Sequence, residues 1–183
     1  MQNNNLKIKI FGGLILIGLG FFFRTIGHIA PNIEYVTAAS LLAGAYLGKK
    51  SAILVPLIIM VLSDTLIGNT NIFLFTWSAY ALIGYLSYLS NLRGKIIRAT
   101  GAGILASIFF YLWTNFGVWA LDSWGMYPKT LAGLIESYLM GLPFLKLNLL
   151  GNLFFVPVSF GIVEMVKSFY ASKSRNLNFL FRR

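Results

Sequence analysis

Long apolar runs alternate with short polar segments along the whole chain. A helix that crosses a membrane needs roughly 20 apolar residues, and the pattern predicts six spans. They cover about 8–23, 35–48, 51–68, 72–90, 97–121 and 147–168. A shorter apolar segment, 130–141, precedes the last span and is predicted to be a separate helix that lies at the interface or re-enters the membrane. The pattern therefore predicts an all-α membrane protein with a single transmembrane domain over residues 1–183.

Prolines and small residues modify this picture. Pro56 lies in the middle of the third run and Pro157 in the sixth, and each is expected to kink its helix. Small residues recur every four positions in the second run (Ala39, Ala43; Ser40, Gly44, Gly48) and the fifth (Ala99, Gly103, Ser107), and glycines are frequent in the first. Such faces let helices approach closely. They fit packing within the chain or a docking face for another membrane subunit, and the sequence does not separate the two.

Composition supports the membrane assignment. Of 183 residues, 57% are hydrophobic and only 11% charged, whereas a soluble domain carries roughly 25% charged residues. The mean hydropathy is +0.75. One helix bundle accounts for this length, which leaves no room for a separate soluble catalytic domain.

The basic residues, which give a net charge of +10, predict the orientation. Cytoplasmic loops are enriched in Lys and Arg. With a cytoplasmic N-terminus and an even number of spans, the outer side carries only Arg24, Lys129 and Lys146. The inner side carries Lys7, Lys9, Lys49, Lys50, Arg93, Lys95, Arg98, Lys167, Lys173, Arg175, Arg182 and Arg183. We therefore expect a multi-pass cell-membrane protein with both termini in the cytoplasm. Its basic tail, 170–183, is expected to lie on anionic lipid rather than nucleic acid.

Several chemistries are excluded by residue usage. The chain has no cysteine and one histidine, His28, so disulfides, thiolate nucleophiles and His-rich metal sites are ruled out. It contains no phosphate-binding loop of the ATPase type, no Gly-x-Ser-x-Gly elbow and no His-Glu-x-x-His motif. We expect no enzymatic activity, no cofactor and no metal.

The stretch 111–152 gathers aromatic, polar and Pro/Gly residues between two apolar runs. It is predicted to form an outward-facing cap over the bundle, and a small ligand could bind there. The competing interpretation is an aromatic belt at the membrane interface with a connecting loop. Trp and Tyr would stack on a flat ligand, while amides and charges would orient it. The candidate ligand-binding residues are Asn115, Trp119, Tyr127, Lys129, Glu136, Asn148 and Asn152.

Asp64 is an eighth candidate. It lies in strongly apolar sequence, VLSDTLIGN, and ionisable groups within membrane spans are costly and often functional. Because it is near the outer end of its span, it could equally cap the helix or meet water.

The chain resembles a family of small bacterial membrane proteins described as possible transport proteins. The resemblance rests on TNFGVW at 114–119, YPKTLAGL at 127–134, SYLMGLPF at 137–144 and LNLLGNLFF at 147–155. It extends over about 32–161, with AASLLAGAYLGKK at 38–50 and VPLIIMVLSD at 55–64. Where that family reads Leu-Gly-Asp, this chain has Gly151 followed by Asn152, which replaces a carboxylate with an amide.

The coarser layout is similar to the substrate-binding S components of energy-coupling factor (ECF) vitamin transporters. The match lies in AGAYLGKKSAILVPLIIMVLSDTLIG, a small-residue helix, a basic turn and an apolar helix. The resemblance implies six helices, capture of a small nutrient such as a vitamin from outside, and a membrane partner with ATPases that supplies energy. The Ala-x-x-x-Ala pattern of many S components is missing from the first helix, where Gly12 to Gly20 could replace it.

Two functional hypotheses remain open at this point. The first is a substrate-binding subunit of the S-component type, with a small-molecule substrate and the lipid bilayer as partners. The second is a scaffold or accessory subunit of another membrane complex, in which the cap would be a protein interface.

Overall fold

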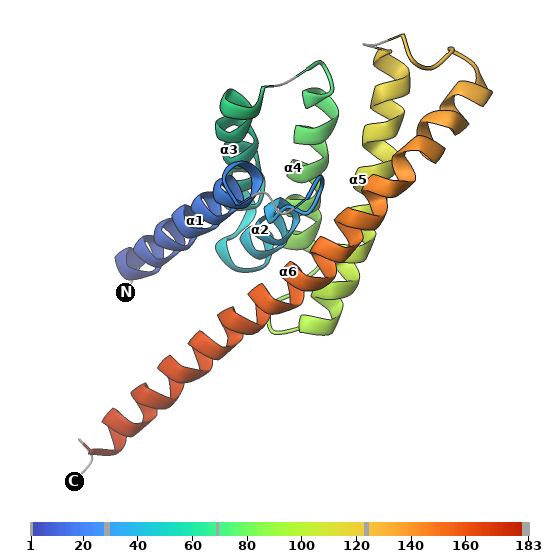
Figure 1. The fold of residues 1–183 in the computed structure, drawn as a ribbon. Helices are drawn as coiled ribbons and strands as arrows, with labels where there is room; N and C mark the ends of the chain where they lie inside the picture. Colours follow the sequence, from blue (N-terminus) through green and yellow to red (C-terminus); the bar gives the residue numbers. More distant parts are fainter. Residues whose placement is uncertain (1, 28–29, 69, 123–124, 181–183) are drawn as a thin grey trace.

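The computed structural model describes the backbone of residues 2–27, 30–68, 70–122 and 125–180, and the side chains of this set from 5 to 172. The described residues form helices and connections only, which confirms the all-α prediction (Figure 1). The helices are α1 (Gln2–Thr25), α2 (Val36–Leu42), the π-helix η1 (Ala43–Leu47), α3 (Lys49–Ile67), α4 (Phe73–Leu89), α5 (Ile96–Leu121) and α6 (Leu131–Leu180).

Four segments of these helices are long and apolar enough to cross a membrane. They are Asn5–Thr25, Lys49–Ile67, Ile96–Leu121 and Leu131–Ser172. The remaining two helical segments, Val36–Leu47 and Phe73–Leu89, are apolar but shorter. The chain is thus a membrane-associated bundle of six helices, in which α2 and η1 form one continuous helical segment.

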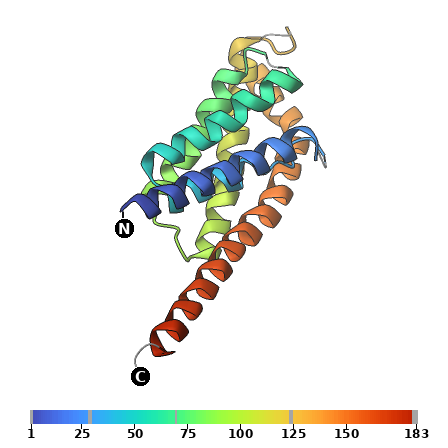
Figure 2. The ribbon, with the colours of Figure 1, turned by 90° about the vertical axis from the view of Figure 1, so that its left-hand side faces the viewer.

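The helices form a bundle with two distinct ends (Figures 1 and 2). The connection between α3 and α4 and the connection between α5 and α6 lie at the same end, which we call the loop end. Both termini point away from it, and α6 projects well beyond the other helices toward the C-terminus. Helix α4 lies between α3 and α5, and α5 runs beside α6.

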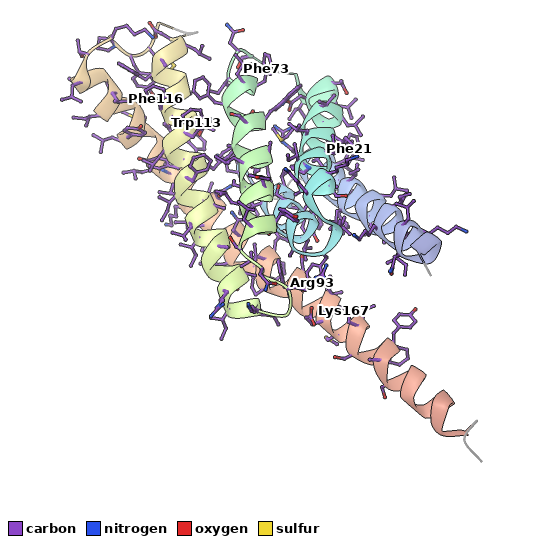
Figure 3. All side chains as sticks on the ribbon, turned by 180° about the vertical axis from the view of Figure 1, so that it is seen from behind. Phe21, Phe73, Arg93, Trp113, Phe116 and Lys167 are labelled. Carbon is purple, nitrogen blue, oxygen red and sulfur yellow. The ribbon has the colours of Figure 1, made fainter. Side chains whose placement is uncertain are left out.

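The opposite end, which we call the basic end, carries clustered cations (Figure 3). The Tyr46 hydroxyl donates to Glu164 Oε1 at 2.7 Å, and Lys167 Nζ lies 2.7 Å from the same oxygen. Arg93 Nε donates to the carbonyl of Ala45 at 3.1 Å. Because these residues come from η1, the α4–α5 turn and α6, this end brings basic residues that are far apart in sequence to one place.

Small residues in the centre of the bundle pack within the chain. Every residue of α2 is buried. A Cβ on Gly44 would overlap the carbonyl oxygen of Gly84, and a Cβ on Gly84 would overlap that of Ala52. In α5, a Cβ on Gly103 would lie 3.0 Å from the Val156 side chain. Of the two explanations for these small-residue faces, close packing within the chain accounts for the second and fifth runs.

The prediction of a separate short helix over 130–141 is wrong. This segment is the first part of α6, which continues without a break through Pro143 and Pro157 to Leu180. Gly141, Pro143 and Lys146 suggested a boundary, but Pro143 and Lys146 are exposed on the outer side of the helix. There a proline removes one backbone donor without a clash against α5, and a lysine can extend toward polar surroundings. The predicted tail is helical from 170 to 180.

Candidate ligand-binding site

A cavity of about 550 Å³ lies between α5 and α6 and reaches from the 122–130 connection to the middle of α5. One face of α5 lines it with Ser107, Tyr111, Thr114, Asn115 and Val118, which recur at the three- and four-residue spacing of a helix face. The opposite wall comes from α6 and the connection before it. It consists of Met126, Tyr127, Met140, Gly141, Phe144, Leu145 and Asn148. Asn32, Thr76 and Phe110 complete the lining.

Gly141 brings the two walls together at the position of Asn115. A Cβ on Gly141 would overlap the amide of Asn115, so only glycine leaves room for that side chain. The Asn115 amide is held by its own helix, because Nδ2 donates to the Tyr111 carbonyl at 2.8 Å. The Ser137 hydroxyl donates to the Asn115 carbonyl at 2.8 Å and ties α6 to α5 beside it. The geometry places a fixed amide on the cavity wall.

A second polar group lies at the base of the cavity. Asn148 Nδ2 donates to the Asn32 carbonyl at 3.3 Å, and its Oδ1 accepts from Asn152 Nδ2 at 3.0 Å. The same Asn152 nitrogen donates to Ser107 Oγ at 2.7 Å. Asn152 is only 1% exposed and is behind the lining, with its Oδ1 buried and without a hydrogen-bond partner among the described residues. Asn148 is therefore presented to the cavity by Asn152, whose own role is positional.

Two of the predicted cap residues, Trp119 and Lys129, have local partners and do not line the cavity. Trp119 Nε1 donates to the Pro128 carbonyl at 3.0 Å. Lys129 Nζ donates to the carbonyls of Trp119 and Ala120, the latter at 2.8 Å, and lies 5.7 Å from the Trp119 ring centre. These contacts satisfy carbonyls at the C-terminal end of α5 and close the turn into α6. Glu136 is exposed on the outer side of α6.

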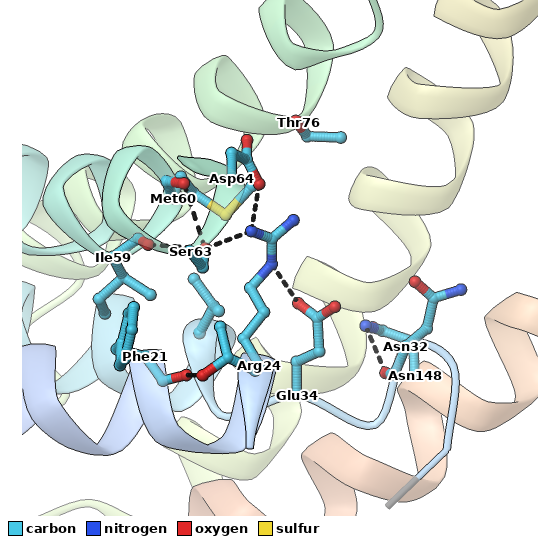
Figure 4. Close-up of polar contacts among 12 residues, drawn as sticks. Phe21, Arg24, Asn32, Glu34, Ile59, Met60, Ser63, Asp64, Thr76 and Asn148 are labelled. Atoms are coloured by element: carbon cyan, nitrogen blue, oxygen red, sulfur yellow. Dashed lines mark hydrogen bonds and ion pairs between the residues drawn. The ribbon is translucent and has the colours of Figure 1, made fainter. Parts of the chain in front are cut away.

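A buried ion cluster lies beside the cavity (Figure 4). It joins α1, α3 and α4. Arg24 Nε lies 3.3 Å from Glu34 Oε2, and Arg24 Nη1 pairs with Asp64 and donates to Ser63. Trp77 Nε1 donates to the other Asp64 oxygen at 2.7 Å. The side chains of Arg24, Glu34 and Asp64 are 12%, 16% and 6% exposed. Asp64 is thus one partner of a buried ion cluster.

The cavity and the ion cluster share the connection between α1 and α2. Asn32 lines the cavity and accepts from Asn148, while Glu34, two residues on, pairs with Arg24. On α4, Thr76 lines the cavity and the next residue, Trp77, binds Asp64. The α1–α2 connection and the first part of α4 therefore each contribute one residue to the cavity and one to the ion cluster.

The eight predicted site residues separate into three groups. Asn115, Tyr127 and Asn148 line the cavity, and Asn152 supports Asn148. Trp119 and Lys129 form the turn between α5 and α6, and Glu136 lies on the outside. Asp64 belongs to the ion cluster.

Sequence reasoning missed Arg24, Glu34 and Trp77. A usable signal was present, because Arg24 directly follows the apolar run FFF near the end of its span. A charge at that position is costly unless it is paired.

The cavity offers amides, hydroxyls and aromatic rings to a ligand. No group of three His, Cys, Asp or Glu side chains that could hold a metal occurs among the described residues. A second cavity of about 350 Å³ lies at the basic end and is lined in part by Lys9, Tyr88, Asn91 and Arg93. The first cavity has the size and mixed lining of a small-molecule site.

Comparison with known proteins identifies the family. Residues 2–175 match DUF6580, a family of unknown function. Because the match covers nearly the whole chain, the chain belongs to this family. No curated protein and no solved structure matches the chain.

Proposed function

We propose that this member of the DUF6580 family is a substrate-binding membrane subunit that captures a small nutrient in the cavity between α5 and α6. The observation that carries the proposal is that cavity. Its volume of about 550 Å³ lies within the range of roughly 300–1,000 Å³ common for small-molecule sites. Apolar and aromatic side chains dominate its lining, and a few amides and hydroxyls are placed among them. Such a combination binds a ligand by burial and orients it by hydrogen bonds.

The orientation of the chain supports uptake from outside. Met126 and Tyr127, from the connection between α5 and α6, line the cavity at the loop end, while Lys9, Arg93 and Lys167 lie at the basic end. Because cytoplasmic surfaces of membrane proteins are enriched in Lys and Arg, the basic end and both termini are assigned to the cytoplasm. The loop end then faces outward and presents the cavity to the exterior.

Single cysteines test this orientation, since the chain has none of its own. Thr130→Cys at the loop end should react with a membrane-impermeant maleimide applied to intact cells. Ser172→Cys, near the C-terminal end of α6, should react only after the cells are opened. The reverse pattern would overturn the outward-facing site.

Energy for uptake would come from a partner, as the resemblance to ECF S components implies. The sequence has no ATPase phosphate loop. In α1, Gly12, Gly13 and Gly20 contact Leu47, Val55 and Ile59 of this chain, so they serve packing within it. A membrane partner would therefore dock on the exposed side of α1, which carries Phe11, Leu14, Gly18 and Phe22.

The proposal is tested by native mass spectrometry of the full chain in mild detergent. We expect a single small molecule that is released on denaturation. It should be lost in Tyr127→Phe, which removes a hydrogen-bonding hydroxyl from the lining and leaves the ring in place. Tyr170→Phe, on the exposed C-terminal part of α6, is the matched control and should retain the molecule. A stable protein partner without ATPases, together with no bound small molecule, would favour the scaffold function instead.

A further inference from the structure

The described walls of the cavity carry no formal charge. None of the fifteen described lining residues is Asp, Glu, Lys or Arg. The ionised residues within two positions of the lining are Glu34, Lys129 and Lys146, and none of them lines the cavity. Lys146 is exposed on α6. Glu34 pairs with Arg24, and Lys129 donates to the backbone at the end of α5. A charged group inside the cavity would therefore lose water without gaining an opposite charge, and this is strongly unfavourable.

Neutral polar groups remain available to a ligand. The Tyr127 hydroxyl, the side-chain amide of Asn32 and Asn115 Oδ1 line the cavity and form no hydrogen bond to a described residue. They include donors and acceptors. By contrast, the hydroxyls of Thr76, Tyr111 and Thr114 donate to backbone carbonyls. The uncommitted groups match a ligand that has neutral donors and acceptors of its own, such as an amide.

The apolar part of the lining favours a flat molecule. Phe110, Tyr111, Tyr127 and Phe144 bring four aromatic rings to the cavity, and Met126 adds a polarisable thioether. Aromatic rings and thioethers interact favourably with the faces and edges of another ring. A planar ligand can contact several of them at once while its polar edge meets the amides.

We infer that the cavity selects an uncharged, planar, hydrogen-bonding molecule, namely an aromatic or heterocyclic amide or a close equivalent. The inference rests on the proposed function, because it names the ligand class of the same site. It excludes carboxylates, phosphates and organic cations as ligands. They are excluded because no described residue of the walls supplies an opposite charge.

Three probes of nearly the same shape test the inference. Benzamide is neutral, benzoate is an anion and benzamidine is a cation at pH 7. Binding to the full chain in nanodiscs is followed by saturation-transfer NMR. The signals measured with Tyr127→Phe and Asn115→Leu are subtracted from the wild-type signal to remove the contribution of probe that partitions into lipid. Tyr170→Phe is the control and should give the wild-type signal. We expect cavity-dependent binding of benzamide at least about tenfold tighter than that of benzoate and benzamidine.

The outcomes separate the inference from the proposed function. Cavity-dependent binding of benzoate or benzamidine as tight as that of benzamide would overturn the inference and leave the binding function intact. A co-purified molecule that is ionised at pH 7 and lost in Tyr127→Phe would do the same. If the wild-type chain holds no small molecule and shows no cavity-dependent binding of any probe, the proposed function fails and the inference fails with it. A neutral co-purified amide would support both.

Discussion

The buried ion cluster gives the sharpest stability prediction. Arg24 pairs with Glu34 and Asp64 and also donates to Ser63, and all three charged side chains are largely buried. Arg24→Met keeps most of the side-chain volume but removes the guanidinium. Two carboxylates are then left close together without their shared cation. Breaking a buried ion pair from one side costs about 3–5 kcal/mol, which for a chain of this size lowers Tm by about 6–20 °C.

The assay is thermal unfolding in one detergent, followed by tryptophan fluorescence and checked by size-exclusion chromatography. The matched control is Lys167→Met, which breaks the Lys167–Glu164 pair at the basic end. Because Lys167 is 48% exposed, that pair contributes less than about 1 kcal/mol. Combining Arg24→Met with Glu34→Gln and Asp64→Leu removes all three charges and should recover most of the lost stability. Equal effects of Arg24→Met and Lys167→Met would refute a buried, mutually dependent cluster.

Three further predictions concern glycines. Gly84→Ala should destabilise the bundle by about 1–3 kcal/mol or more, because its Cβ meets the backbone of Ala52. Gly18→Ala, whose Cβ meets nothing within 4 Å, should be neutral or slightly stabilising in the same melting assay. Gly141→Ala should push the Asn115 amide off its position, so that ligand affinity falls while Tm changes little. Unchanged affinity in a folded Gly141→Ala protein would contradict the assigned cavity wall.

Hydropathy identifies the helices well because an apolar segment in a membrane must hydrogen-bond its backbone polar groups internally, and a helix does this. The predicted runs 51–68, 72–90 and 97–121 correspond closely to α3, α4 and α5. The end of one helix and the start of another are harder to predict. In α6, a proline and a lysine lie on an exposed side where the helix tolerates them, so residue type alone suggested an interruption.

The candidate site was predictable only where neighbours in sequence are also neighbours on one helix face. Asn148 and Asn152 are four residues apart and hydrogen-bond each other. The pairing of Arg24 with Asp64 joins residues forty positions apart, and no local pattern indicates it. Trp119 and Lys129 have the residue types of a binding site, but the unpaired carbonyls at the end of α5 and before α6 engage both of them.

Asn32 tests whether the α1–α2 connection serves the cavity through its side chain or its backbone. Its φ is 62°, a left-handed conformation that asparagine adopts more readily than alanine and glycine adopts freely. Asn32→Gly should therefore keep the bend, the carbonyl that accepts from Asn148 and a Tm close to that of the wild type, while benzamide binding weakens because the amide is gone. Asn32→Ala should lose the amide and also cost about 1–2 kcal/mol in backbone strain. If Asn32→Gly binds benzamide as the wild-type chain does, the ligand does not use the Asn32 amide, and the Tyr127 hydroxyl becomes the main candidate among the uncommitted groups.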